Sequence, residues 1–279
     1  MLIKEVLLKA QKLLQKQGIA SAKLDAELLL IATLKIDKLT LYNSYQKELS
    51  TTELNEFQQL LDKRRQYMPI AKILGKKEFY GLDFMVNQDV LDPRPDTEIL
   101  LDRILKTYPK DAKLNILELG VGSGCIIITL LNLLKVSRGT AVDISKAALH
   151  IAEQNAEQHH VTERLDLIES DLFSEITAKY DLLISNPPYI AAAEIEALDA
   201  DVRLYDPMQA LVAGEDGLDF YRKIAEQAHN YLNSEARIIL EIGHQQKAAI
   251  TKLFQDQGYY LEAADKDYGG NDRVLVFSY

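Results

Sequence analysis

The chain has 279 residues, of which 47% are hydrophobic, so it can bury the core of one large domain or two smaller ones. A single cysteine, Cys125, excludes an internal disulfide and a cysteine-based zinc cluster, and no apolar stretch is long enough to span a bilayer. The first helical segment lacks the features of a signal peptide, and a formal net charge of −10 argues against a broad nucleic-acid-binding face. We therefore expect a soluble cytoplasmic protein without a structural metal.

The first part of the chain is predicted to be helical. Apolar residues recur at helical spacing up to Gly18, and a second helical pattern starts near Ser21. Ser50 and Glu53 have the spacing of a capping box, which predicts the start of a third helix. We therefore expect a small helical domain over residues 1–70.

The remainder predicts a linker and an α/β domain. Aromatic and polar residues alternate around Gly81, which indicates a hairpin in a linker over 71–92. In the domain over 93–279, strand and helix patterns alternate, which predicts a doubly wound, largely parallel sheet. The last two strands are close in sequence and should form a hairpin. The expected strands are 115–119, 140–143, 165–169, 180–185, 236–242, 259–264 and 273–278.

A glycine-rich turn follows the first strand of the α/β domain. Its Gly-x-Gly-x-Gly spacing, over 120–124, lets the backbone approach a ligand at a helix N-terminus and differs from the spacing of dinucleotide sites. Asp143 ends the next strand, where a carboxylate can accept both hydroxyls of an unmodified ribose, and Asp171 follows the third strand. These three strand ends together predict a site for a neutral or cationic adenosine compound. The glycine turn alone would fit a plain strand–helix connection equally well.

The fourth strand ends abruptly at Ser185 and is followed by Asn186, Pro187, Pro188 and Tyr189. Because prolines fix the backbone, the carbonyls of Asn186 and Pro187 can be held pointing outward beside the expected cofactor. With the side-chain oxygen of Asn186, they could accept both N–H groups of a planar amine, against the aromatic face of Tyr189. The pattern indicates a site that orients a planar nitrogen nucleophile, with a simple Pro-Pro turn as the alternative.

Several motifs in this order resemble those of one known family, the HemK/PrmC peptide chain release factor N5-glutamine methyltransferases. The resemblance covers the whole chain and rests on PRPDTE (93–98), ELGVGSG (118–124), AVDIS (141–145), SDLF (170–173), SNPPYI (185–190) and EDGLDFYRKI (215–224). It implies a Rossmann-like methyltransferase sheet, with its C-terminal hairpin, after a helical substrate-recognition domain. It also implies S-adenosylmethionine as cofactor and, as substrate, the glutamine of the Gly-Gly-Gln motif in class 1 release factors. The expected enzyme is a monomer with no direct contact to nucleic acid or membrane.

The resemblance also implies roles for individual residues. Val121 departs from the threonine that the family often has. Glu241 ends a strand and either faces the pocket or is solvated. Two other activities stay open, because the Asn-Pro-Pro-Tyr motif is also found in enzymes that methylate a glutamine of a large-subunit ribosomal protein and in adenine-N6 methyltransferases of nucleic acids. The cofactor is expected on Gly120, Val121, Gly122, Ser123, Gly124, Asp143, Asp171, Leu172 and Asn186, and the glutamine on Asn186, Pro187, Pro188 and Tyr189, with Asn186, Pro187 and Tyr189 as the catalytic residues.

Overall fold

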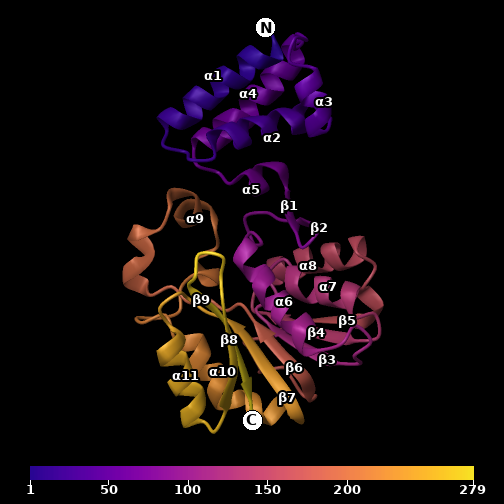
Figure 1. The fold of residues 1–279 in the computed structure, drawn as a ribbon, viewed down its shortest axis with the longest axis vertical. Helices are drawn as coiled ribbons and strands as arrows, with labels where there is room; N and C mark the ends of the chain where they lie inside the picture. Colours follow the sequence, from indigo (N-terminus) through magenta and orange to yellow (C-terminus); the bar gives the residue numbers. More distant parts are fainter. The chain divides into compact units, whose positions relative to one another are not determined.

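The computed structural model describes all 279 residues and divides into two compact units. The helical unit comprises Met1–Lys76 together with Asp199–Tyr205, and the sheet unit comprises Lys77–Leu198 and Asp206–Tyr279 (Figure 1). A short segment from late in the chain therefore packs with the N-terminal helices. No helix combines the length and the apolar character needed to cross a membrane.

The helical unit is built around an apolar core to which α1, α2 and α4 contribute most of the side chains. The predicted capping box is present at the start of α4. The Ser50 hydroxyl accepts from the backbone N–H of Glu53 at 3.3 Å, and the Glu53 carboxylate accepts from the backbone N–H of Ser50 at 2.8 Å. The helices are α1 (Ile3–Lys16), α2 (Ala22–Leu34), α3 (Lys38–Asn43), α4 (Thr51–Arg65), α5 (Ile70–Leu74) and α9 (Ala200–Tyr205).

A buried ion pair joins α2 to α4. Arg64 Nε donates to Asp25 Oδ2 at 2.7 Å, and both side chains are almost completely buried. Arg64 Nη1 also donates to the carbonyls of Tyr67 at 3.1 Å and Met68 at 3.2 Å. These bonds satisfy carbonyls just beyond the end of α4, where the helix itself supplies no partner.

The sheet unit contains a seven-stranded sheet in the order β5-β4-β3-β6-β7-β9-β8. The first five strands are parallel, and β9 runs antiparallel to both of its neighbours, so the predicted α/β sheet with a C-terminal hairpin is confirmed. All seven expected strands are present, although β7 begins four residues early. The strands are β3 (Asn115–Leu119), β4 (Arg138–Asp143), β5 (Leu165–Glu169), β6 (Tyr180–Ser185), β7 (Leu232–Glu241), β8 (Tyr260–Lys266) and β9 (Asp272–Ser278), and the small predicted hairpin is β1 (Lys76–Phe79) with β2 (Leu82–Met85).

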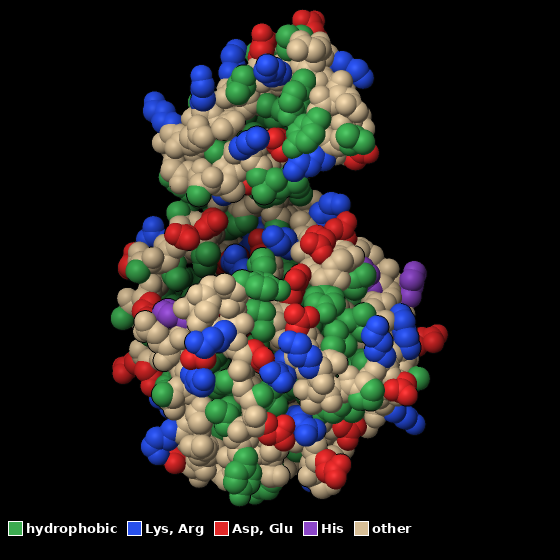
Figure 2. Space-filling view, in the orientation of Figure 1, with side chains coloured by type: hydrophobic (Ala, Val, Ile, Leu, Met, Phe, Trp, Pro, Cys, Tyr) green, Lys and Arg blue, Asp and Glu red, His purple; other side chains and the backbone are tan.

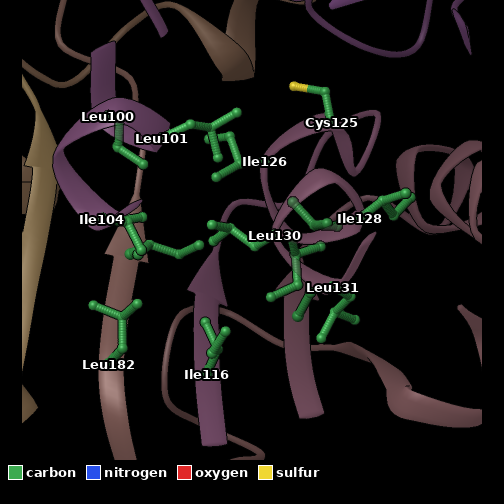
Figure 3. Close-up of a cluster of buried hydrophobic side chains, with 14 of the residues drawn as sticks. Leu100, Leu101, Ile104, Ile116, Cys125, Ile126, Ile128, Leu130, Leu131 and Leu182 are labelled. Atoms are coloured by element: carbon green, nitrogen blue, oxygen red, sulfur yellow. The ribbon is translucent and has the colours of Figure 1, made fainter. Parts of the chain in front are cut away.

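Helices cover both faces of this sheet. On one face, α6 (Glu98–Thr107), α7 (Cys125–Leu133) and α8 (Lys146–Gln158) enclose one apolar cluster. On the other, α10 (Asp219–Gln227) and α11 (Lys247–Asp256) enclose a second (Figure 1). Figure 3 shows Ile116 of β3 and Leu182 of β6 within the first cluster, near Ile104 of α6 and Leu130 of α7. Because both faces are covered, the central strands are largely apolar, and most of their polar groups lie near the strand ends.

The order of the strands creates a switch point between β3 and β6. From β3 the chain continues through β4 and β5 on one side, and then crosses to β6 and β7 on the other. Leu119 of β3 is paired with Ser185 of β6, so the glycine turn and Asn186 leave the sheet side by side. Such a switch point is where ligands bind in open α/β sheets.

Candidate active site

A concave pocket lies at the carboxyl ends of β3, β4 and β6 and holds about 1040 Å³ of atom-free space, part of it open to solvent. Three residues expected at the site, namely Gly124, Pro187 and Tyr189, do not line it. Gly124 lies behind the wall, because a side chain there would come within 2.6 Å of Ile128 Cδ1. The expected residues that do line the pocket are Gly120, Val121, Gly122, Ser123, Asp143, Asp171, Leu172, Asn186 and Pro188.

The glycine turn is held open by backbone hydrogen bonds. The N–H groups of Gly120 and Val121 both donate to the carbonyl of Val142 at 2.9 Å, which ties the turn to β4. Gly122 has a φ of +53°, in the region that residues with side chains rarely adopt, and a Cβ there would meet no atom within 4 Å. The turn therefore leaves room for a ligand to approach its backbone.

Asp143 lines the pocket at the end of β4. Its two carboxylate oxygens accept from the N–H of Gly122 at 3.0 Å and from that of Ser145 at 2.9 Å. Burial raises the pKa of Asp143, and these two hydrogen bonds oppose the shift. Each carboxylate oxygen has further acceptor capacity, so the side chain is fixed in place and can still receive the hydroxyls of a ribose.

The predicted adenine end of the pocket has a strained backbone. Leu172 has a φ of +49°, which is unusual for a residue with a side chain. Ser170, which the sequence reasoning missed, stabilises this turn: its hydroxyl donates to the carbonyl of Leu172 at 2.9 Å and accepts from the N–H of Glu175 at 3.1 Å. Asp171 lies at the rim with an exposed carboxylate, 4.0 Å from Lys223 Nζ.

Asn186 is half-buried at the end of β6 and lines the pocket. Its Nδ2 donates to Thr97 Oγ1 at 3.3 Å. Tyr189 does not line the pocket: its carbonyl accepts from Gln246 Nε2 at 2.9 Å, and burial raises the pKa of its hydroxyl, which keeps it neutral. Pro187 is buried beneath the turn. The motif thus presents Asn186 and Pro188 to the pocket, while Pro187 and Tyr189 lie outside its lining.

The segment before α6 forms the part of the pocket that the sequence reasoning did not assign. The two prolines of the PRPDTE motif were the available signal, but nothing local indicated where this segment lies. Arg94 reaches across to the segment after α9, where its Nη2 donates to Asp206 Oδ2 at 2.6 Å. Further lining residues include Asp89, Asp92, Pro93, Arg94, Thr97, Glu118, Cys125, Ser170, Pro207, Gln209 and Phe220.

Two glutamates are buried near the pocket. Glu118 Oε2 accepts from the N–H of Ile127 at 3.1 Å, and burial raises the pKa of this carboxyl well above its ordinary value. Glu241 is only 1% exposed, so the alternative of a solvated strand end is wrong. Burial raises its pKa to about 7.

The charge of the pocket favours a cationic adenosine compound. One guanidinium lines it against four aspartates, Asp89, Asp92, Asp143 and Asp171, while burial favours the neutral form of the fifth carboxyl group, that of Glu118. An open glycine turn and a fixed strand-end carboxylate fit the amino-acid and ribose parts of a sulfonium nucleoside, and the acidic wall fits its positive charge. The fold and this pocket define a methyltransferase of the class that uses S-adenosylmethionine.

Comparison with known proteins narrows this class to a family. Models of the PrmC N-terminal domain and of the methyltransferase small domain match residues 5–75 and 87–205. A release factor glutamine methyltransferase of Agrobacterium fabrum is 36% identical, over 97% of this chain and 95% of its own length. A bifunctional methyltransferase of Rickettsia felis is 39% identical over 99% of this chain, which spans only 58% of that protein. The chain belongs to the family of release factor glutamine methyltransferases.

A solved structure shows the same fold at low identity. The crystal structure of a methyltransferase from Pyrococcus furiosus is similar with a TM-score of 0.52 and 20% identity, over 80% of this chain and 96% of that one. At this identity the likeness concerns the arrangement of strands and helices and carries no information on substrate.

Proposed function

We propose that this chain methylates the side-chain amide nitrogen of the glutamine in the Gly-Gly-Gln motif of class 1 peptide chain release factors. The observation that carries the proposal is the position of Asn186, which lies in the pocket wall directly beside the glycine turn. The Agrobacterium fabrum relative is named a release factor glutamine methyltransferase and matches along nearly its whole length. Methylation of adenine in nucleic acid is less favoured, because the net charge of −10 opposes binding to phosphates.

The proposed chemistry places few demands on the protein beyond orientation. An amide nitrogen is a poor nucleophile because its lone pair is delocalised. When bound, S-adenosylmethionine supplies a methyl group activated by its positively charged sulfur. The Asn186 side-chain oxygen accepts one N–H of the substrate amide, and the Asn186 backbone carbonyl is proposed as the second acceptor, because Pro187 does not line the pocket. These bonds strengthen as positive charge develops on nitrogen, and they therefore stabilise the transition state. One N–H is replaced by N–CH3, and one proton is released.

The cofactor is proposed to lie along the strand ends. The turn over 120–124 would face its amino-acid part, Asp143 its ribose hydroxyls, and Asp171 with Leu172 its adenine. For Tyr189 we retain only a role in supporting the loop that presents Asn186, since its ring does not line the pocket.

The helical unit is proposed to bind the protein part of the substrate. One face of α1 exposes Leu8 (48%) and Leu13 (39%), and Lys9, Lys12 and Lys16 are exposed at neighbouring positions on the same face. Figure 2 shows basic side chains along the edge of the helical unit that α1 forms. Exposed apolar side chains among cations suit a partner surface that carries acidic residues.

The decisive experiment uses S-adenosylmethionine with a labelled methyl group. We expect label in a purified class 1 release factor, located at the glutamine by mass spectrometry, and none in a factor with that glutamine replaced by alanine. Parallel reactions contain large-subunit ribosomal proteins or nucleic acid. Label in either of these, with an unlabelled release factor, would overturn the proposal.

A further inference from the structure

The loop that carries Asn186 is fixed at its start by the sheet. Ser185, the last residue of β6, is paired with Leu119 of β3 and Leu240 of β7. The Ser185 hydroxyl also donates to the Leu119 carbonyl at 2.7 Å. The two prolines that follow Asn186 have no N–H group with which to hold the loop farther along. The path of the loop after Asn186 is therefore determined by whatever holds its other end.

The other end of the loop is held by a side chain from a distant part of the sequence. Gln246, the residue before α11, donates from Nε2 to the Tyr189 carbonyl at 2.9 Å. The same nitrogen donates to the Gly217 carbonyl at 3.2 Å, and Gln246 Oε1 accepts from the Gly243 N–H at 3.0 Å. Gln246 therefore connects the Asn-Pro-Pro-Tyr motif to the EDGLDFYRKI motif and to the turn after β7.

The orientation of the Gln246 carboxamide follows from its partners. A backbone carbonyl can only accept and a backbone N–H can only donate, so the nitrogen must face the two carbonyls and the oxygen must face the N–H. Other side chains of similar length cannot make these contacts. An ionised glutamate has no donor, and methionine has none either. The three hydrogen bonds therefore require glutamine at this position.

Two glycines allow the backbone to approach this side chain. A Cβ at Gly217 would lie 2.4 Å from the Tyr189 carbonyl oxygen and 2.7 Å from Gln246 Nε2. A Cβ at Gly243 would lie 2.8 Å from Gln246 Oε1 and 3.4 Å from Tyr189 Cδ2. The carboxamide is therefore packed tightly between the loop and two backbone segments, and it has little room to take another position.

We propose that Gln246 is a positioning residue for methyl transfer, which fixes the path of the loop and so keeps the Asn186 carboxamide in the pocket wall. The two prolines transmit this constraint from Tyr189 to Asn186, because their rings restrict φ to about −65°. The inference rests on the proposed function, in which Asn186 receives the substrate amide. Gln246 does not line the pocket, and it acts only through the loop.

The kinetic test replaces Gln246 with glutamate, which has nearly the same shape. Its carboxylate would face the carbonyls of Tyr189 and Gly217 without a proton to donate, so we expect the loop to move and kcat on release factor to fall by about tenfold or more. The dissociation constant for S-adenosylmethionine should change by less than about twofold, because the proposed cofactor residues lie on other segments. The matched control is Gln245→Glu, which makes the same change of charge at the exposed neighbouring residue and should leave kcat unchanged.

Gln246→Met tests the same contacts without adding a charge. It removes both donors, so kcat should fall by less than in Gln246→Glu but in the same direction, and this variant decides the test if Gln246→Glu does not fold. All rates are measured well below the melting temperature of each variant. Equal losses of kcat and of S-adenosylmethionine affinity would show that Gln246 only supports the fold, and they would overturn the proposal.

A second readout does not depend on methylation. The side-chain amide protons of Asn186 can be identified in ¹H–¹⁵N spectra by their absence in Asn186→Asp. We expect their resonances to shift in Gln246→Met and to stay in place in Gln245→Glu. Unchanged Asn186 resonances in Gln246→Met would overturn the positioning role. If the wild-type chain does not methylate release factor, the proposed function fails, and the spectra still decide whether Gln246 positions Asn186.

Discussion

At the scale of single residues, Asn186 is expected to determine turnover. Replacing it with alanine removes the acceptor whose bond strengthens as charge develops on nitrogen, and it leaves both prolines in place. We expect kcat to fall by about 10²–10³ with little change in cofactor affinity. Single-turnover rates on release factor measure this effect directly. A wild-type rate in Asn186→Ala would show that Asn186 only shapes the turn and does not act on the substrate amide.

Asp143 is expected to determine cofactor affinity. Its carboxylate is already fixed by the N–H groups of Gly122 and Ser145, so it meets a ribose without a further loss of conformational freedom. Each charge-assisted bond contributes roughly 1.5–3 kcal/mol, so Asp143→Ala should weaken S-adenosylmethionine binding by at least about tenfold. Calorimetry measures the affinity, and a thermal melt shows whether the glycine turn has been disturbed. An unchanged dissociation constant for S-adenosylmethionine would contradict the proposal that Asp143 binds its ribose hydroxyls.

At the scale of elements, the ion pair between α2 and α4 should dominate the stability of the helical unit. Arg64→Met leaves the Asp25 carboxylate buried without its partner, and we expect the free energy of unfolding to fall by about 3–5 kcal/mol. Arg65→Met removes a neighbouring arginine whose ion pair with Asp62 is half-exposed, and it should cost less than about 1 kcal/mol. Urea denaturation followed by circular dichroism compares the two. Equal losses of unfolding free energy in the two variants would contradict the proposal that burial makes the Arg64–Asp25 pair the more important one.

At the scale of the whole molecule, the helical unit is expected to select the protein substrate. Lys9→Glu with Lys12→Glu reverses the charge of the α1 face without removing any buried side chain. We expect slower methylation of whole release factor and an unchanged rate on a short Gly-Gly-Gln peptide. Lys110→Glu with Lys135→Glu makes the same change in net charge on the sheet unit and serves as the control. Point substitutions are preferable to deletion of residues 1–76, because Asp199–Tyr205 packs with that region.

The stability of the molecule should also depend on pH through Glu241. Its pKa is raised from 4.5 to about 7 in the folded chain, so the folded state holds this proton more tightly than the unfolded state. The stabilisation that protonated Glu241 gives to the folded state is therefore complete below about pH 4.5. It is lost as the pH rises through about 7, which lowers the free energy of unfolding by roughly 3 kcal/mol. Glu241→Gln should be more stable than wild type at pH 8, and the difference should vanish near pH 4. Urea denaturation of both proteins at pH 8 and at pH 4 measures this difference, and a Glu241→Gln protein that is less stable than wild type at pH 8 would contradict it.

The strands and the chemistry at their ends could be read from the sequence. A buried parallel strand is a short apolar run bounded by turn residues, and this pattern lies entirely within neighbouring positions. The glycine turn, Asp143 and Asn186 were predictable for the same reason, since each follows directly on such a run. Belonging to the methyltransferase family could be predicted because the motifs occur in a fixed order.

Other features were decided only by the tertiary structure. Thr97 and Asn186 are 89 residues apart along the chain, and their side chains meet only because the segment before α6 packs beside the end of β6. No local pattern indicates that Asp199–Tyr205 joins the helical unit, or that Tyr189 stays outside the pocket lining. Residue type and spacing determine which groups are placed at a strand end. Which of those groups touch one another depends on the order of the strands and on how side chains fill the space between layers, and these are properties of the packed chain as a whole.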